Sequence, residues 1–204
     1  MKYLLYIIAA GIVGGLIIGG VHLLRVAQKN KKEMAQYSGE EVKLNKKFGK
    51  VLVVYYSLSG HTKQIAEIIK QETNADVYEI KTVEKVDTTP WFYMTLREQL
   101  KEKKYPEIKQ DFPNLSQYDM IFVGAPVWWY TMATPLYSFL QKVDFGGKKV
   151  VPFSTQGSNF GTYFEDFAKQ AKNANLQISQ AFNNLPHDYQ KEERNKVVQW
   201  LNQL

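Results

Sequence analysis

The hydrophobic and polar positions divide the chain into three parts. Tyr3–Leu24 is one apolar stretch, and from Phe48 onward short apolar runs alternate with stretches of helical spacing. The residues between these two parts are polar and lysine-rich, with only scattered apolar positions and no evident packed face. The predicted parts are a transmembrane anchor over residues 1–25, a basic juxtamembrane tether over residues 26–47, and one folded domain over residues 48–204.

The folded part begins with Val51–Tyr56, a continuous run of β-branched and aromatic residues. A run without alternation suits a central parallel strand that is buried on both faces. Comparable segments are Val77–Ile80, Met120–Ala125, Val150–Phe153 and, more weakly, Leu176–Phe182. Apolar residues at helical spacing follow these segments at 65–69, 96–100, 136–143, 164–171 and 197–201. Five such alternations predict an α/β fold, a doubly wound five-stranded parallel sheet whose ligands lie outside the carboxyl ends of the strands.

The N-terminal apolar stretch has 22 residues and no formal charge except on an ionised His22. As a helix it spans about 33 Å, which is enough to cross a bilayer. The alternative is a cleavable signal peptide, which has a shorter apolar core and a small-x-small cleavage site. Arg25, Lys29, Lys31 and Lys32 follow the stretch. The positive-inside rule therefore predicts a single-pass protein of the cell membrane with its domain in the cytoplasm.

Three glycines, Gly11, Gly15 and Gly19, fall at intervals of four residues on one face of this helix. Such spacing lets two helices approach closely, which makes a homodimer one interpretation. The other interpretation is that glycine is simply common in membrane helices.

Composition limits the possible chemistry. The 204 residues include no cysteine, which excludes disulfides, thiolate metal sites and a cysteine nucleophile, so redox chemistry requires a bound cofactor. The net charge is +6, of which +5 lies in residues 1–47 and only +1 in the remainder. The basic excess therefore lies beside the apolar stretch, and we expect membrane contact and no nucleic-acid binding.

The loop after the first predicted strand contains Ser57, Ser59, Gly60, His61 and Thr62, and a helix follows it. Unpaired backbone N–H groups at a helix N-terminus favour a phosphate, and the hydroxyls add further donors. Glycine lets the backbone approach the ligand closely. The alternative is an ordinary Ser/Thr N-cap, which needs only one hydroxyl.

This S/T-x-S/T-G-x-T loop resembles the phosphate-binding signature of flavodoxins. Residues 118–129 are similar to the third strand and following loop of a flavodoxin subfamily with a P-x-W-W motif, and residues 144–158 continue the likeness. The resemblance covers about residues 48–172. It implies a flavodoxin-like sheet in the order 2-1-3-4-5 and FMN as a non-covalently bound cofactor.

The resemblance also implies which loops hold the flavin ring, which needs flat apolar or aromatic walls. The second loop supplies Pro126, Val127, Trp128, Trp129 and Tyr130, although adjacent tryptophans also occur as core plugs. The third loop supplies Thr155, Gln156, Gly157 and Gly161, whose backbone N–H groups suit the polar edge of a flavin, and Phe160 or Tyr163 as a further aromatic wall. The alternative for the third loop is a flexible surface loop.

Two other features carry less information. His61 and His187 lack metal-ligand or triad spacing, so we predict no metal site and no catalytic residue. The aromatic segment Thr89–Tyr93 either shapes access to the flavin or packs against the sheet edge.

The predicted function is that of a membrane-anchored, FMN-binding electron carrier or quinone-type oxidoreductase, and if it is an enzyme it uses NAD(P)H. Its predicted partner is a redox protein or a quinone. The competing prediction is a non-enzymatic membrane adaptor whose pocket is empty or structural.

Overall fold

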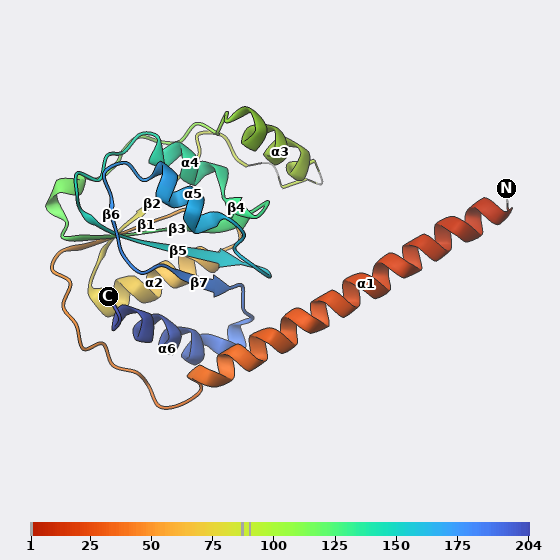
Figure 1. Ribbon diagram of the computed structural model, residues 1–204, viewed down its shortest axis with the longest axis horizontal. Coiled ribbons are helices and arrows are strands. Elements are labelled where there is room, and N and C mark those ends of the chain that lie inside the picture. Colours follow the sequence, from red (N-terminus) through yellow and green to blue (C-terminus); the bar gives the residue numbers. More distant parts are fainter. Residues whose placement is uncertain (1, 87, 90) are drawn as a thin grey trace.

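Strands and helices alternate from residue 51 onward in the computed structural model (Figure 1). The structure describes residues 2–86, 88–89 and 91–204. For residues 2–5 and 7–10 it describes the backbone alone. The strands are β1 Val51–Tyr55, β2 Asp76–Glu79, β3 Met120–Trp128, β4 Thr131–Met132, β5 Lys149–Gln156, β6 Asn175–Leu176 and β7 Gln180–Asn183. The α-helices are α1 Lys2–Met34, α2 His61–Thr73, α3 Phe92–Glu102, α4 Thr134–Leu140, α5 Tyr163–Gln170 and α6 Gln190–Leu201. Short 3-10 helices lie at Ala35–Tyr37, Leu115–Gln117 and His187–Tyr189.

The central sheet has the order β2-β1-β3-β5-β6, with all four of these pairings parallel. This confirms the predicted 2-1-3-4-5 order. The predicted fifth strand is divided in two, because β6 pairs with the start of β5 whereas β7 pairs with its second half. Between them the carbonyl of Ile178 leaves the sheet and accepts a hydrogen bond from the Trp200 indole at 2.9 Å.

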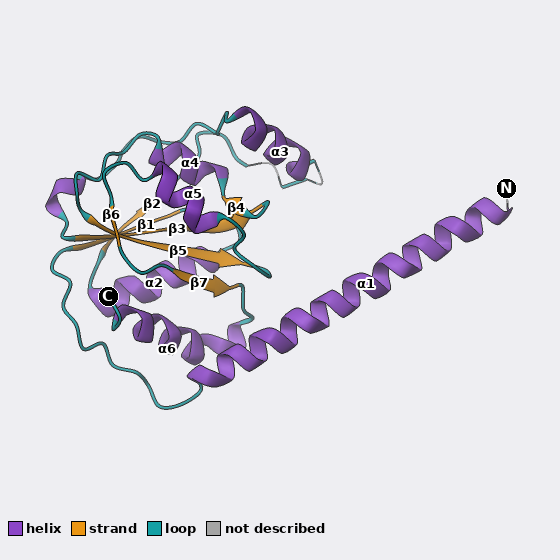
Figure 2. Cartoon of the chain, viewed as in Figure 1, coloured by secondary structure: helices purple, strands orange, loops and turns teal. Residues whose placement is uncertain are grey.

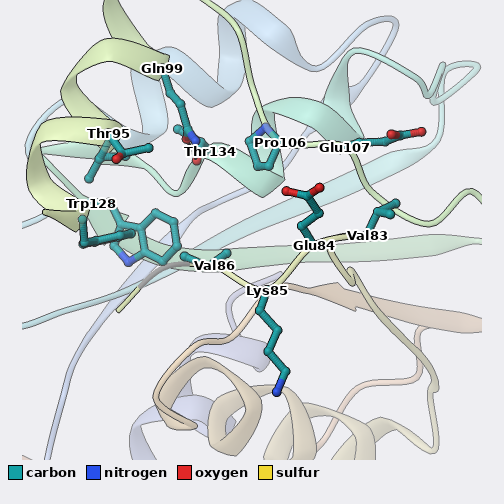
Figure 3. Close-up of a pocket in the computed structure, with 12 residues that line it drawn as sticks. Val83, Glu84, Lys85, Val86, Thr95, Gln99, Pro106, Glu107, Trp128 and Thr134 are labelled. Carbon is teal, nitrogen blue, oxygen red and sulfur yellow. Dashed lines mark hydrogen bonds between the residues drawn. The ribbon is translucent and has the colours of Figure 1, made fainter. Parts of the chain in front are cut away.

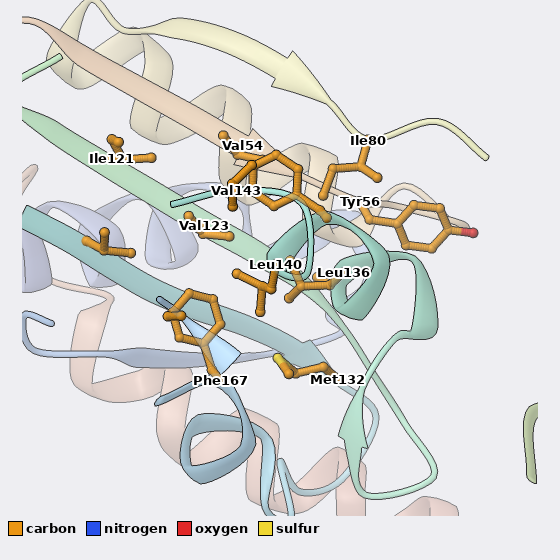
Figure 4. Packing of buried hydrophobic residues seen from close by; sticks show 14 of the residues in the cluster. Val54, Tyr56, Ile80, Ile121, Val123, Met132, Leu136, Leu140, Val143 and Phe167 are labelled. Carbon is orange, nitrogen blue, oxygen red and sulfur yellow. The ribbon is translucent and has the colours of Figure 1, made fainter. Parts of the chain in front are cut away.

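Both faces of the sheet are covered by helices (Figure 2). Leu52 and Val54 of β1 face a cluster that includes residues of α4 and α5, while Val51, Val53 and Tyr55 face a cluster with residues of α2 and α6. Figure 4 shows part of the first cluster, in which side chains of β1 and β3 meet those of α4 and α5. This two-sided burial explains why the strand runs are apolar without alternation.

Helix α1 projects from the domain, and its C-terminal end lies beside α6 (Figure 1). Among the described residues it is the one helix long and apolar enough to cross a membrane: an 18-residue window within Gly11–Tyr37 has a mean hydropathy of 1.5, and none of that window is buried.

The segment predicted as a tether makes specific contacts with α6. Met34 is buried, the backbone N–H of Val42 donates to the Asn195 side chain at 2.9 Å, and that of Asn45 donates to Asn202 at 2.9 Å. The sequence analysis found no packed face here, because the contacts are made largely by backbone groups that any sequence possesses.

Candidate functional site

The three predicted loops meet at the carboxyl ends of β1, β3 and β5. The hydroxyl of Thr62, in the first turn of α2, lies 2.7 Å from the hydroxyl of Thr155 at the end of β5. The carbonyl of Tyr130 in the second loop accepts a hydrogen bond from the backbone N–H of Thr162 at 2.8 Å. The third loop therefore contacts both of the others, and the predicted residues lie around one edge of the sheet.

The first loop leaves the N-terminus of α2 without a side-chain cap. Its N-cap residue is Gly60, with φ +96°, and no side chain accepts a hydrogen bond from the first turn. The Ser57 hydroxyl instead accepts from the Gly60 N–H at 3.1 Å, which shapes the turn before the helix. The alternative of an ordinary Ser/Thr N-cap is therefore wrong. The first-turn N–H groups, the exposed Ser59 and the positive end of the helix dipole suit an anion.

The second loop is a tight hairpin, which the sequence did not predict. β3 extends to Trp128 and pairs with β4 in an antiparallel register, leaving only Trp129 and Tyr130 between them. Both residues have positive φ, +51° and +63°. A two-residue turn of this kind favours Asn and Gly, and a left-handed backbone costs other residues about 1–2 kcal/mol each. The hairpin therefore carries backbone strain while holding two aromatic rings at the edge of the sheet.

The two tryptophans have different environments. Trp128 is half-buried, and its ring makes edge contacts with Tyr56 at 5.5 Å and Phe92 at 4.9 Å. Trp129 is exposed, and its ring lies 6.2 Å from that of Tyr93. One indole is thus fixed by packing and the other is available at the surface. Pro126 and Val127, which precede them on β3, are half-buried.

A cavity of about 500 Å³ lies between the first loop, the second loop and α3. Leu58 borders it on the side of the first loop, Trp128 and Trp129 on the second, and Phe92 and Tyr93 on α3. Its walls are mainly apolar and aromatic, as a flat ring system requires. Phe92 and Tyr93 of the aromatic segment therefore line the cavity, and Phe92 also packs against Trp128 at the end of β3, so the structure shows features of both interpretations.

The third loop is held by its first and last residues. The buried Gln156 side chain donates to Asn183 at 3.2 Å and accepts from the Ser154 hydroxyl at 3.0 Å, so it points into the protein. At Gly161, with φ +54°, a Cβ would lie 2.1 Å from the Tyr130 carbonyl oxygen, so only glycine fits against the hairpin. Gly157 and Phe160 between them are exposed.

Of the two aromatic candidates from this region, only Phe160 reaches the surface. Tyr163 is fully buried, and its hydroxyl donates to the Phe153 carbonyl at 2.9 Å. Phe153 in turn requires the glycine at position 124, where a Cβ would lie 2.2 Å from its ring.

The titratable groups near the site are few. Burial, and to a smaller extent His187, lowers the pKa of the His61 imidazole below its ordinary value. Burial raises the pKa of the Asp166 carboxyl, but hydrogen bonds from Thr131 and Thr162 outweigh this and hold it below its ordinary value. Within the part of the chain that the structure describes, no group of three metal-ligating side chains forms a site.

A second cavity of about 500 Å³ lies on the other side of Phe92 and Trp128. Figure 3 shows Trp128 at one end of it and Glu84 and Glu107 at the other. Gln99 and Thr134 also line it and are joined by a hydrogen bond of 2.7 Å. Both polar and apolar groups thus line a space large enough for a small ring compound.

The arrangement suits a ligand with an anionic group at one end and a flat ring at the other. The sequence analysis found the three loops and offered a role in access for the segment that contains Phe92 and Tyr93, but it did not predict Leu58 as a lining residue. Phe92 and Tyr93 are separated in sequence from the loops they join, and the only signal for them was the aromatic content of residues 91–93.

Comparisons with known proteins agree with this geometry. A family model described as Flavodoxin matches residues 50–204. The chain is 31% identical to a flavoprotein in complex with FMN from Lactobacillus acidophilus NCFM, with a TM-score of 0.60 over 66% of this chain and 93% of that one. The apo-form of the flavoprotein from that organism is 28% identical, with a TM-score of 0.52 over 67% and 93%. A protein from Bacteroides uniformis ATCC 8492 is 26% identical, with a TM-score of 0.61 over 76% and 98%. A comparison with curated proteins found no match.

Proposed function

Because the chain belongs to the flavodoxin family, we propose that it is a membrane-anchored flavoprotein acting in electron transfer or as an FMN-dependent oxidoreductase. FMN is its cofactor, as the family and the FMN complex of the 31% identical Lactobacillus acidophilus flavoprotein indicate. The observation that carries the proposal is the uncapped N-terminus of α2 beside an aromatic cavity. Bound FMN supplies the electron-accepting and electron-donating chemistry.

The residues of the chain bind and orient this group. The first turn of α2, with Ser57, Ser59 and Thr62, holds the phosphate through N–H and O–H donors. Trp129 and Tyr93 supply flat surfaces for the ring, and aromatic contacts of this kind contribute about 0.5–1.5 kcal/mol beyond area burial. The backbone N–H groups of the third loop would meet the polar edge of the ring. The walls of the cavity exclude water from one side and leave the edge beside Trp129 accessible.

FMN titration of the full-length protein in detergent tests the phosphate site. Ser59→Asp places a carboxylate where the phosphate binds and removes a donor. Since a hydrogen bond to a charged group contributes about 1.5–3 kcal/mol, the Kd for FMN should rise by about tenfold or more. Ser116→Asp, at an exposed serine near the amino end of β3, is the control and should leave the Kd unchanged. Equal affinities in the two variants would exclude this phosphate site.

Two assays separate the functional alternatives. Steady oxidation of NAD(P)H with a quinone by the purified protein alone supports a reductase, whereas its absence supports a carrier that needs a partner protein. In a reductase, the cavity between Trp128 and Glu84 is the candidate place for the second substrate. The competing adaptor function predicts a colourless protein that does not take up added FMN.

The anchoring role of α1 is part of the same proposal. Its length and apolar character support a membrane span, and a signal sequence removed after the apolar stretch is the alternative. The mass of the protein isolated from membranes distinguishes the two. Protease accessibility in intact and lysed cells tests the predicted cytoplasmic side.

A further inference from the structure

The end of α1 is clamped to the domain. The carboxylate of Glu33 accepts from the Lys196 ammonium at 2.6 Å and from the Asn183 amide at 2.7 Å. The Lys196 side chain is only 6% exposed, and Met34 beside it is buried. Groups from α6 and β7 therefore hold the last turn of α1, so the helix has a defined direction relative to the sheet.

This direction places the flavin-binding edge on the membrane side. One turn before the clamp, the Lys29 ammonium donates to the Ser158 carbonyl of the third loop at 3.2 Å. From there α1 continues past the carboxyl ends of the strands, toward the side to which the arrowheads of β3, β5 and β7 point (Figure 2). Its axis therefore leads from the third loop directly toward the segment proposed to lie in the membrane.

The distance along the helix is short. The apolar stretch ends at Leu24, and the five residues from there to Lys29 span about 7.5 Å. The headgroup layer on each side of the hydrocarbon core is about 5–8 Å thick. The third loop therefore lies at the level of the lipid headgroups when the apolar stretch is in the bilayer.

The same edge carries a group of exposed aromatic and apolar side chains, here called the edge patch. Its members are Trp91, Tyr93, Met94, Trp129, Tyr130 and Phe160, which are between 44% and 67% exposed. They come from α3 and the residue before it, the β3–β4 hairpin and the third loop. Figure 1 shows α3 and the free part of α1 projecting toward the same side of the domain. Four of the six are Trp or Tyr, the residues enriched where proteins meet the membrane interface.

We propose that the edge patch docks on the bilayer that holds α1, so that the cavity between Leu58 and Trp129 opens into the headgroup layer. The proposal rests on the membrane anchoring proposed above. It explains why side chains of this size and apolarity are exposed together, since such patches in soluble proteins mark interaction sites. It also specifies the class of redox partner, because an amphiphilic carrier dissolved in lipid, such as a quinone, reaches this edge without leaving the membrane.

The absence of cysteine allows single labelling sites for a test in the full-length, FMN-loaded protein. Met94→Cys carries a nitroxide within the edge patch, and Leu176→Cys carries one at the opposite, amino end of the sheet, where β6 pairs with the start of β5. Both positions are exposed apolar residues. Leu16→Cys, within α1, reports anchoring itself. The protein is reconstituted in vesicles of phosphatidylcholine and phosphatidylglycerol, and collisions with oxygen and with a water-soluble nickel complex are measured.

The expected result is loss of nickel accessibility and gain of oxygen accessibility at positions 94 and 16, with position 176 accessible to nickel. A label at 94 as accessible to nickel as that at 176, while 16 stays in lipid, overturns the docking and leaves the anchor intact. The edge patch would then be free for a protein partner. A label at 16 accessible to nickel overturns the anchor and the docking together. Flavin absorbance of each labelled protein verifies that the site remains folded.

Discussion

The contact between the third loop and the β3–β4 hairpin can be tested by Gly161→Ala. Gly161 has φ +54°, and a Cβ there would lie 2.1 Å from the Tyr130 carbonyl oxygen. A left-handed backbone costs alanine about 1–2 kcal/mol, and relieving an overlap costs about 1–3 kcal/mol more. In a chain of this size each kcal/mol lowers Tm by about 2–4 °C, so we expect Tm to fall by at least about 4 °C.

Two other glycines separate the causes of this effect. At Gly147, φ is +81° and no atom lies within 4 Å of the position that a Cβ would take. Alanine there has the cost of the left-handed backbone without the overlap. Gly157, in the same loop as Gly161, carries neither. The expected order of destabilisation is therefore Gly161→Ala, then Gly147→Ala, then Gly157→Ala, the last changing stability by no more than about 0.5 kcal/mol.

Thermal unfolding of the apo protein in detergent, followed by tryptophan fluorescence, measures this order. FMN titration of the same preparations should show weaker binding in Gly161→Ala and unchanged binding in Gly147→Ala, which lies at the amino end of β5. Equal Tm values for these two variants would refute the overlap with Tyr130. A large fall in Tm with unchanged FMN affinity would show that the loop contact stabilises the fold without shaping the site.

Three further predictions concern the hairpin, a buried carboxyl and the helix clamp. Replacing Trp129 and Tyr130 by Asn and Gly relieves about 1–2 kcal/mol of backbone strain per residue, so Tm should rise. FMN binding should weaken, because the aromatic rings of the hairpin are removed. Tighter FMN binding would contradict this prediction. Burial raises the pKa of the Glu193 carboxyl from 4.5 to about 7, so the folded state holds this proton more tightly than the unfolded chain. This contribution to stability is complete below pH 4.5 and is lost as the pH rises through about 7. Across this window Tm should therefore fall less steeply in Glu193→Gln than in the unchanged protein. Parallel curves of Tm against pH for the two proteins would exclude the effect. Glu33→Gln leaves Lys196 as a buried charge without its carboxylate, so it should lower Tm more than Lys196→Met does, and the reverse order would argue against the clamp.

The sheet could be predicted from the sequence because burial on both faces leaves an unmistakable pattern. Val51 to Val54 point alternately to two covered faces, so every position must be apolar. The fifth strand was less well predicted, since β6 and β7 are short, lie at the edge and include exposed residues such as Leu176. An edge strand with one solvated side carries a weaker signal than a central one.

The candidate site was predictable where backbone chemistry needs particular residue types, and not where distant segments meet. The loop around Gly60 was found because an uncapped helix start needs a glycine and hydroxyls. The hairpin was missed because Trp129 and Tyr130 are among the last residues expected in a left-handed turn. Phe92 lines the cavity because it packs against Trp128, which is distant in sequence. No local sequence pattern predicts such a contact.

The clamp on α1 is continuous with the third loop, which is proposed to contact the flavin. Asn183 donates to Glu33 of α1 and accepts from Gln156, where β5 ends and the third loop begins. The third loop is held a second time by Lys29, which donates to its Ser158 carbonyl. The groups that fix the direction of α1 therefore also fix the start of the third loop. Because these buried amides have few other partners available, a change in the seating of α1 must either break this chain of hydrogen bonds or move the third loop with it.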